Sequence, residues 1–275
     1  MTKPPVSVVD LHVHLFPQRL FEAVWRYFET RSWPVHHEHV DQVAGTLAVH
    51  GVSRACVLCY PHRRGVARSL NAFMESVALR YPQFYPFGCV HLDDPEMAAD
   101  VDYVISSPHL HGFKFQPLVQ NFSINDPRLD YLYRRCVEED VLIMMHAGSA
   151  PIANSFVGFS HFSKLIRRFP ELRICVAHMG AFESDDFLQL LDDYPLVYLD
   201  TTMINVRTRL FDTTWRGNAE RLQRHSDRIC FGSDWPNVPY PYWEALASIE
   251  RFPLPEEARP LVLHDNALRF LKLLA

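Results

Sequence analysis

Short apolar runs alternate with helical patterns along the whole chain, and this alternation limits the possible folds more than any other feature. Eight runs are dense in Val, Ile, Leu, Phe and Cys, as strands buried on both faces should be. They cover residues 7–16, 55–60, 84–90, 112–116, 141–146, 173–178, 196–200 and 228–234. Eight strands separated by helices predict an α/β fold, either a (β/α)8 TIM barrel or a large doubly wound sheet.

Helical patterns with clear start and stop signals fill the gaps between the runs. Asp126 is a good N-cap and Pro127 suits the first helical position. One buried stripe then follows at helical spacing: Leu129, Leu132, Tyr133, Cys136 and Val137. A second stripe after Ser160 consists of Phe162, Leu165, Ile166 and Phe169. Residues 31–40 are the least regular part and are expected to form an insertion after the first strand.

The lack of glycine-rich phosphate loops favours the barrel over the doubly wound sheet. Neither G-x-G-x-x-G nor the P-loop pattern occurs in the sequence, which weakens the dinucleotide-binding alternative. No Ser/Gly-rich linker divides the chain, and 275 residues suit one α/β barrel. We therefore predict a (β/α)8 TIM barrel with a single domain over residues 1–275.

Charge and cysteine placement exclude several classes of protein. Lys and Arg number 27 against 32 Asp and Glu, a formal net charge of −5. Because no run of like charge occurs, neither a nucleic-acid partner nor a membrane partner is expected. No stretch is apolar enough for a signal peptide or a membrane span, so a cytoplasmic protein is expected. Cys56 and Cys59 point to opposite faces of a strand, and no disulfide is predicted.

Two histidines in the first run share one face of a strand. His12 and His14 are two residues apart, so their imidazoles leave the same side roughly 6–7 Å apart along the strand. That separation suits two ligands converging on one ion. Asp10 lies on the same face, one step deeper.

Three of the later runs end in a residue that we single out as a candidate for the site. His146, His178 and Asp234 each follow an apolar stretch, and in a barrel such residues gather at the C-terminal rim where active sites lie. A lone strand histidine is more often a hydrogen-bonded core residue, and Asp234 could cap a helix. Four histidines and a carboxylate together would leave costly buried polar groups unless they bind something. Imidazole and carboxylate suit Zn²⁺, Fe²⁺, Mn²⁺ or Co²⁺, so a catalytic metal site is predicted.

These residues resemble a known metal signature. Asp10-x-His12-x-His14, His146, His178 and Asp234 together are similar to the signature of the amidohydrolase superfamily. Residues 263–271, LHDNALRFL, resemble the terminal helix of its amidohydrolase-related branch, which includes the aminocarboxymuconate-semialdehyde decarboxylase-like enzymes. The resemblance implies that His12, His14, His146 and Asp234 bind one metal ion, usually Zn²⁺, with His178 acting beside it.

Lys114, in the run GFKFQ, has three interpretations. In binuclear members of the superfamily a lysine on the fourth strand is carboxylated and bridges two metals, so a second metal is expected only if Lys114 is carboxylated. A free ammonium could instead bind an anionic group of the substrate. The third alternative is a structural residue. Decarboxylase-like members usually lack this lysine.

Several other residues are weaker candidates for the functional site. His62 and Arg63, with Arg64, follow the second run and form either a solvated loop or a site for a substrate carboxylate. Trp235, Phe113 and Phe156 could line an aromatic pocket, although packing explains each one singly. The cluster of His36, His37 and His39 is expected in a solvated loop rather than at a second metal. Rim residues without a distinguishing signal are Asn154, Thr201, Thr202 and Arg207.

The preferred function is a metal-dependent hydrolase of a small, carboxylated ester, lactone or amide. Metal-bound water would be the nucleophile, with Asp234 as general base and His178 as electrophile. The alternative is non-oxidative decarboxylation of an aromatic or unsaturated acid at the same metal. Two hypotheses remain. The metal could be purely structural, or the protein could be a phosphodiesterase, although its negative net charge counts against the phosphodiesterase. The expected partner is a small carboxylate-bearing substrate, and a homodimer is left open.

Overall fold

The structure is a computed structural model that describes residues 7–150 and 154–274. Its contacts divide the chain into two compact units. The terminal unit consists of Met1–Val57 and Asp200–Ala275, and the central unit of Leu58–Leu199. Along the chain, strands β1 to β8 alternate with helices, the order expected of a (β/α)8 fold.

In the terminal unit, strands and helices come from both ends of the chain. Its elements are β1 (Val8–His14), α1 (Gln18–Arg31), α2 (Val40–Val49), β2 (Val52–Leu58, the last residue of which begins the central unit), α9 (Ala219–Arg224), η3 (Ser226–Arg228), β8 (Ile229–Cys230), α10 (Tyr242–Ile249), α11 (Ala258–Pro260), η4 (Leu261–Asp265) and α12 (Asn266–Phe270). All seven residues of β1 are buried. The polar residues of β1 therefore lie inside the protein and must find partners there.

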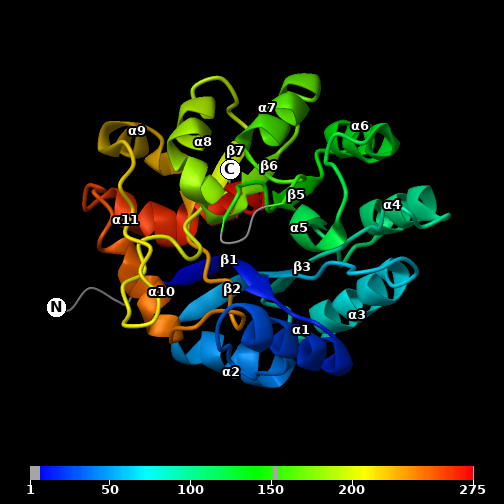
Figure 1. The fold of residues 1–275 in the computed structure, drawn as a ribbon, viewed down its shortest axis with the longest axis horizontal. Helices are drawn as coiled ribbons and strands as arrows, with labels where there is room; N and C mark the ends of the chain where they lie inside the picture. Colours follow the sequence, from blue (N-terminus) through cyan, green and yellow to red (C-terminus); the bar gives the residue numbers. More distant parts are fainter. Residues whose placement is uncertain (1–6, 151–153, 275) are drawn as a thin grey trace. The chain divides into compact units, whose positions relative to one another are not determined.

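The central unit contains a run of parallel strands. Its elements are α3 (Ala67–Arg80), β3 (Phe84–Phe87), α4 (Met97–Ser106), β4 (Gly112–Phe115), α5 (Pro117–Gln120), η1 (Pro127–Leu129), α6 (Asp130–Glu138), β5 (Leu142–Met145), α7 (Phe159–Arg168), β6 (Ile174–Val176), η2 (Ala177–Glu183), α8 (Ser184–Leu190) and β7 (Val197–Asp200). Parallel pairing joins β4 to β5, β5 to β6 and β6 to β7. Figure 1 shows α7 and α8 beside these strands. Asp200, the last residue of β7, belongs to the terminal unit.

The local predictions from the sequence are confirmed. Each of the eight apolar runs overlaps one strand, although β2 begins at Val52, three residues before its run. The Asp126 side chain accepts a hydrogen bond from the Arg128 amide and caps η1, which continues into α6. The second stripe belongs to α7, which begins at Phe159 after Gly158 rather than after Ser160. Residues 32–39 are irregular, as expected, and lie between α1 and α2.

The cysteines are buried, as small hydrophobic side chains are. Cys56, Cys59, Cys89, Cys136, Cys175 and Cys230 are free and buried. Burial raises the pKa of the Cys230 thiol, so it stays protonated and packs as a small hydrophobic group. Among the described residues, no helix combines the length and hydrophobicity that crossing a bilayer requires.

Candidate metal centre

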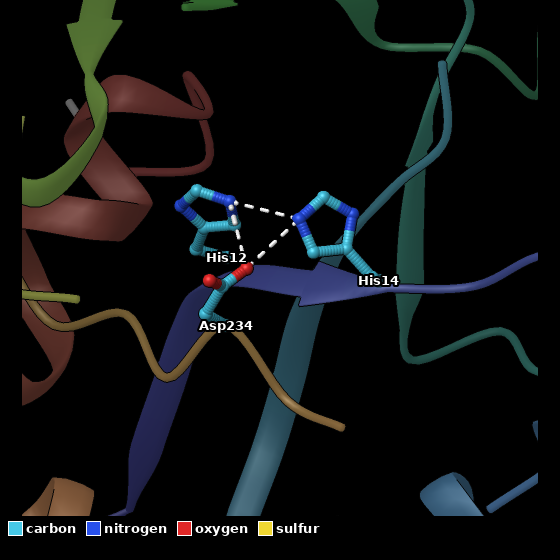
Figure 2. Close-up of side chains that lie close together, drawn as sticks. All are labelled: His12, His14 and Asp234. Carbon is cyan, nitrogen blue, oxygen red and sulfur yellow. Dashed lines mark hydrogen bonds and ion pairs between the residues drawn. The ribbon is translucent and has the colours of Figure 1, made fainter. Parts of the chain in front are cut away.

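Three side chains of the terminal unit converge on a small triangle of ligand atoms. His12 and His14 extend from β1, and Asp234 comes from the loop after β8 (Figure 2). The His14 Nε2 lies 2.9 Å from the Asp234 Oδ1 and 3.2 Å from the His12 Nε2. The third side, from the His12 Nε2 to the Asp234 Oδ1, is 3.6 Å. The predicted pair on β1 and the carboxylate from the far end of the chain are therefore brought together.

The size of this triangle fits a divalent transition ion. Ligand atoms about 2.1 Å from one ion, at tetrahedral or octahedral angles, lie about 3.0–3.4 Å from one another. The three observed separations cover this range. His12, His14 and Asp234 are exposed by only 1, 3 and 8%. Two imidazoles and a carboxylate, buried together, suit Zn²⁺, Mn²⁺ or Fe²⁺ rather than Ca²⁺ or Mg²⁺, which prefer oxygen ligands.

Asp200 contacts His12 on the side of the ring opposite the triangle. The Asp200 Oδ2 lies 2.8 Å from the His12 Nδ1, and the Asp200 Oδ1 accepts a 3.0 Å hydrogen bond from the Thr202 amide. Asp200 is fully buried. With Nδ1 held by this carboxylate, the Nε2 of His12 faces His14 and Asp234.

Asp10 ties together the two backbone segments that carry the ligands. Its Oδ1 accepts hydrogen bonds from the amides of His12 (3.0 Å) and Ser233 (3.1 Å). Its Oδ2 accepts a 2.7 Å bond from the Tyr242 hydroxyl. Burial raises the pKa of Asp10 to about 7, and the hydrogen bonds from Ser233, His12 and Tyr242 oppose that rise. Asp10 thus holds the backbone segments that carry His12 and Asp234, and it is not one of the three side chains of the triangle.

The loop after β8 is held in the conformation that presents Asp234. The Asp234 amide donates to the His12 carbonyl (2.8 Å), and the His14 amide donates to the Trp235 carbonyl (2.7 Å). Asp234 has φ +62°, a left-handed conformation that Asp tolerates better than most residues. Position 232 requires glycine because neighbouring side chains lie close to its backbone. A Cβ there would lie 2.9 Å from the His12 Cβ and still nearer to the Thr202 hydroxyl.

Trp235 packs inside the terminal unit. It is 3% exposed, and its indole N–H donates to the Glu38 Oε2 at 2.8 Å. The His36 ring stacks on it with a centroid separation of 4.1 Å. The predicted role of Trp235 in substrate binding stays a prediction. His36 and His39 are half-buried and only His37 is exposed, so the segment is not a fully solvated loop.

His146 and His178 form a second pair, within the central unit. His146 follows β5, His178 follows β6, and their ring centroids are 4.9 Å apart in an edge-to-face arrangement. Both are buried. A Cβ on Gly148 would overlap the backbone of Gly180, so the two loops that carry the histidines approach closely. The roles of His146 as a metal ligand and of His178 as a catalytic group stay predictions.

Strained backbone accompanies His178. His178, Met179 and Gly180 have positive φ angles of 57°, 50° and 75°. Successive non-glycine residues in this region cost of order 1 kcal/mol each, and such strain clusters at functional sites. Glu183 supports the loop, because its carboxylate accepts hydrogen bonds from the amides of Ser149 and Phe159, both at 3.0 Å.

The remaining candidate residues differ in how far they are exposed to solvent. Lys114 lies in β4 and is 1% exposed, and its three interpretations all stay open. His62 and Arg63 are exposed in the loop after β2. Partial burial, together with the charges of Arg63 and His91, lowers the pKa of His62. Phe113, Thr201 and Thr202 are buried, Asn154 and Phe156 are half-buried, and Arg64 and Arg207 are exposed.

Three residues that contact the triangle or its neighbours were not among the predicted site residues: Asp200, Tyr242 and Glu38. Asp200 carried the same signal as His146, since it ends an apolar strand run. Tyr242 and Glu38 carried none, because their contacts with Asp10 and Trp235 span 232 and 197 residues.

The triangle is a candidate metal site on an α/β fold with eight alternating strands and helices. A family model described as amidohydrolase matches residues 9–273. The chain therefore belongs to the amidohydrolase family and is an enzyme of that superfamily. A search of the curated proteins returned no match.

Solved structures confirm the predicted fold class. An uncharacterised TIM-barrel protein from Bordetella bronchiseptica is 18% identical, with a TM-score of 0.75 over 97% of this chain and 99% of its own. A 2,6-dihydroxybenzoate decarboxylase from Rhizobium is 17% identical, with a TM-score of 0.68 over 97% and 99%. A 5-carboxyvanillate decarboxylase from Novosphingobium aromaticivorans, complexed with manganese and 4-hydroxy-3-methoxy-5-nitrobenzoic acid, is 14% identical, with a TM-score of 0.70 over 99% and 97%. The fold is thus the predicted α/β (β/α)8 TIM barrel.

Proposed function

We propose that this protein is a metal-dependent, non-oxidative decarboxylase of an aromatic acid. The observation that carries the proposal is the buried His12–His14–Asp234 triangle, on a fold shared with two aromatic-acid decarboxylases along nearly the whole chain. This was the alternative in the sequence analysis. Hydrolysis, the preferred prediction there, has less support because two of the three solved structures described above are decarboxylases.

His12, His14 and Asp234 would hold one divalent ion, with His146 as the predicted fourth ligand. We propose Zn²⁺ and test Mn²⁺ beside it, because a neighbour in the comparison is complexed with manganese. The ion would supply Lewis acidity that binds and polarises oxygen atoms of an acidic substrate.

The reaction needs one bond cleaved and one proton delivered. The ring carbon loses its carboxylate as CO₂ and keeps the electron pair of the broken bond, and a proton then replaces the carboxylate on that carbon. Asp234 and His178 are the proposed proton carriers. An acid within hydrogen-bond reach of the carbon is what such a step requires.

Buried polar groups near Asp234 could orient the substrate. The Asn237 side chain is 1% exposed, and neither of its amide atoms has a hydrogen-bond partner among the described residues. Its backbone amide donates to the Asp234 carbonyl at 2.9 Å, so Asn237 lies one turn after Asp234 in the loop. Leaving a buried amide unpaired costs about 1–3 kcal/mol. A substrate hydroxyl or carboxylate, or a water molecule, would satisfy it.

The test compares two products across two substrate panels. Metal-loaded protein is incubated with 2,6-dihydroxybenzoate, 5-carboxyvanillate and related hydroxybenzoates while CO₂ is measured, and with carboxylated lactones, esters and amides while acid release is measured. CO₂ release lost in Asp234→Asn but kept in the exposed control Asp212→Asn would support the proposal. Acid release without CO₂ would favour hydrolysis instead.

Hydrolysis remains the second candidate because of Lys114. The superfamily resemblance links a lysine on this strand to binuclear hydrolases, and Lys114 is buried in β4. Lys114→Ala separates the two functions. A decarboxylase should keep turnover in this variant, whereas a binuclear hydrolase that depends on a carboxylated Lys114 should lose both turnover and its second metal ion.

A further inference from the structure

A buried carboxylate at the end of a strand faces the inner nitrogen of one proposed ligand. Asp200 ends β7, and its Oδ2 lies 2.8 Å from the His12 Nδ1. Asp200 is fully buried and His12 is 1% exposed. A carboxylate without solvent is costly unless hydrogen-bond donors satisfy it, so each contact of Asp200 matters.

The two oxygens of Asp200 meet different donors. Oδ1 accepts from the Thr202 amide at 3.0 Å, and Oδ2 faces the His12 Nδ1. A carboxylate can only accept, so Nδ1 carries the proton of a neutral His12. The lone pair of that imidazole is then on Nε2, the atom 3.2 Å from the His14 Nε2 and 3.6 Å from the Asp234 Oδ1.

We infer that Asp200 is a positioning residue for the metal centre: it fixes the tautomer and the ring orientation of His12 so that Nε2 can bind the ion. This inference rests on the proposed function, because it presumes that His12 is a ligand. A carboxylate that holds the second nitrogen of a ligating histidine orients the ring and raises its basicity.

The Asp200→Asn variant should invert the tautomer. The Thr202 amide still needs an acceptor, so the Asn carbonyl oxygen takes the position of Oδ1. The Asn NH₂ group then faces the His12 Nδ1 and donates to it. The proton of His12 moves to Nε2, where it blocks the ligand position. The opposite orientation of the amide would set two donors, the NH₂ group and the Thr202 amide, against each other.

The first measurement is the tautomer of His12 in the wild-type protein. Proton–nitrogen correlation spectra of ¹⁵N-histidine-labelled, metal-free protein at pH 8 report the tautomer, and a His12→Gln variant assigns the His12 signals. We expect a protonated Nδ1 and an unprotonated Nε2 in the wild type. A wild-type His12 with its proton on Nε2 would overturn the inference.

The second measurement is metal affinity, by competition with a chromophoric chelator for Zn²⁺ and for Mn²⁺. Loss of an outer partner of a ligating histidine typically weakens affinity 10–100-fold. We expect that loss in Asp200→Asn, which equals about 1.4–2.8 kcal/mol. Glu244→Gln is the matched control, because it neutralises another buried carboxylate of the same unit without touching His12. Its affinity should stay within about twofold of the wild type.

The outcomes separate the inference from the proposed function. If the wild type binds the ion and Asp200→Asn binds it within threefold, the inference is wrong and the metal centre stands. Equal losses in Asp200→Asn and Glu244→Gln would also overturn it, since the effect would then be general destabilisation. If the wild type binds neither ion, the proposed function fails, and with it the inference that His12 is positioned for a metal.

Discussion

Glu244 forms a buried ion pair whose removal should be measurable as lost stability. Its Oε1 accepts hydrogen bonds from the Arg251 Nη1 (2.6 Å) and the Arg207 amide (2.9 Å), and its Oε2 accepts from the Arg251 Nη2 (3.0 Å). The Glu244 side chain is 2% exposed and the Arg251 side chain 24%. Arg251 also donates to the Asn205 carbonyl, in the segment that follows Asp200.

Glu244→Gln should lower the free energy of unfolding by about 2–3 kcal/mol at pH 7. The variant keeps an oxygen at Oε1 but places an NH₂ group against the Arg251 Nη2, so one charge-assisted hydrogen bond and the charge of the pair are lost. Hydrogen bonds to charged groups are worth about 1.5–3 kcal/mol. The fuller cost of breaking a buried pair, about 3–5 kcal/mol, is discounted because Arg251 is partly exposed.

The stability difference between the wild type and Glu244→Gln should depend on pH. Burial raises the pKa of Glu244, but the hydrogen bonds from Arg251 and the Arg207 amide, with the charge of Arg251, outweigh burial and hold it below the usual value of 4.5. A lowered pKa contributes stability that is present above the unfolded value and is lost as pH falls through the folded one. The difference between wild type and Glu244→Gln should therefore shrink as the pH falls below about 4.5.

Urea unfolding followed by circular dichroism, at pH 7 and at a pH below about 4.5, measures both effects. Glu250→Gln is the control, because Glu250 pairs with Arg259 at the surface and is 59% exposed. Exposed pairs contribute under about 1 kcal/mol. A Glu244→Gln difference below about 0.5 kcal/mol at pH 7, or one that grows on acidification, would refute this reasoning.

Three further outcomes are expected. Asp234→Asn should keep much of its metal, measured by elemental analysis, but lose CO₂ release; near-normal turnover of the loaded variant would contradict the role of Asp234. Gly232→Ala should lower the melting temperature, at a cost of about 1–3 kcal/mol, because its Cβ would press on His12 and Thr202; an unchanged melting curve would show that the loop has room. At a free metal concentration 100 times the dissociation constant, the bound ion should stabilise the wild type by about 2.7 kcal/mol, and a chelator should remove that stabilisation. The His14→Ala variant should show no difference in stability with and without the chelator. A difference equal to that of the wild type would place the ion elsewhere.

The strands and the first ligand pair were predictable because their signals are local. A parallel strand buried on both faces needs a continuous apolar run, so each run indicated a strand directly. His12 and His14 were predicted on one face from a two-residue spacing, and their Nε2 atoms lie 3.2 Å apart. Asp234 could be predicted as their partner only because a polar residue at the end of a late run joins the same rim in a barrel.

Contacts over long separations were not predictable in the same way. Asp200 ends an apolar run just as His146 does, but an aspartate at a strand end is common in loops, and nothing in the sequence showed that it meets His12. Trp235 was predicted on a rim loop with packing as one explanation, but its packing partners Glu38 and His36, about 200 residues earlier, were not predicted. Such residues become visible only when the fold brings the segments together.

The location of a bound ion tests the metal centre most directly. A crystal of zinc-loaded protein, measured on both sides of the zinc absorption edge, gives an anomalous difference map that locates the metal independently of any assay. We predict one peak about 2.0–2.2 Å from the His12 Nε2, the His14 Nε2 and the Asp234 Oδ1. A peak at other residues, or no peak in protein that folds normally, would contradict the assignment.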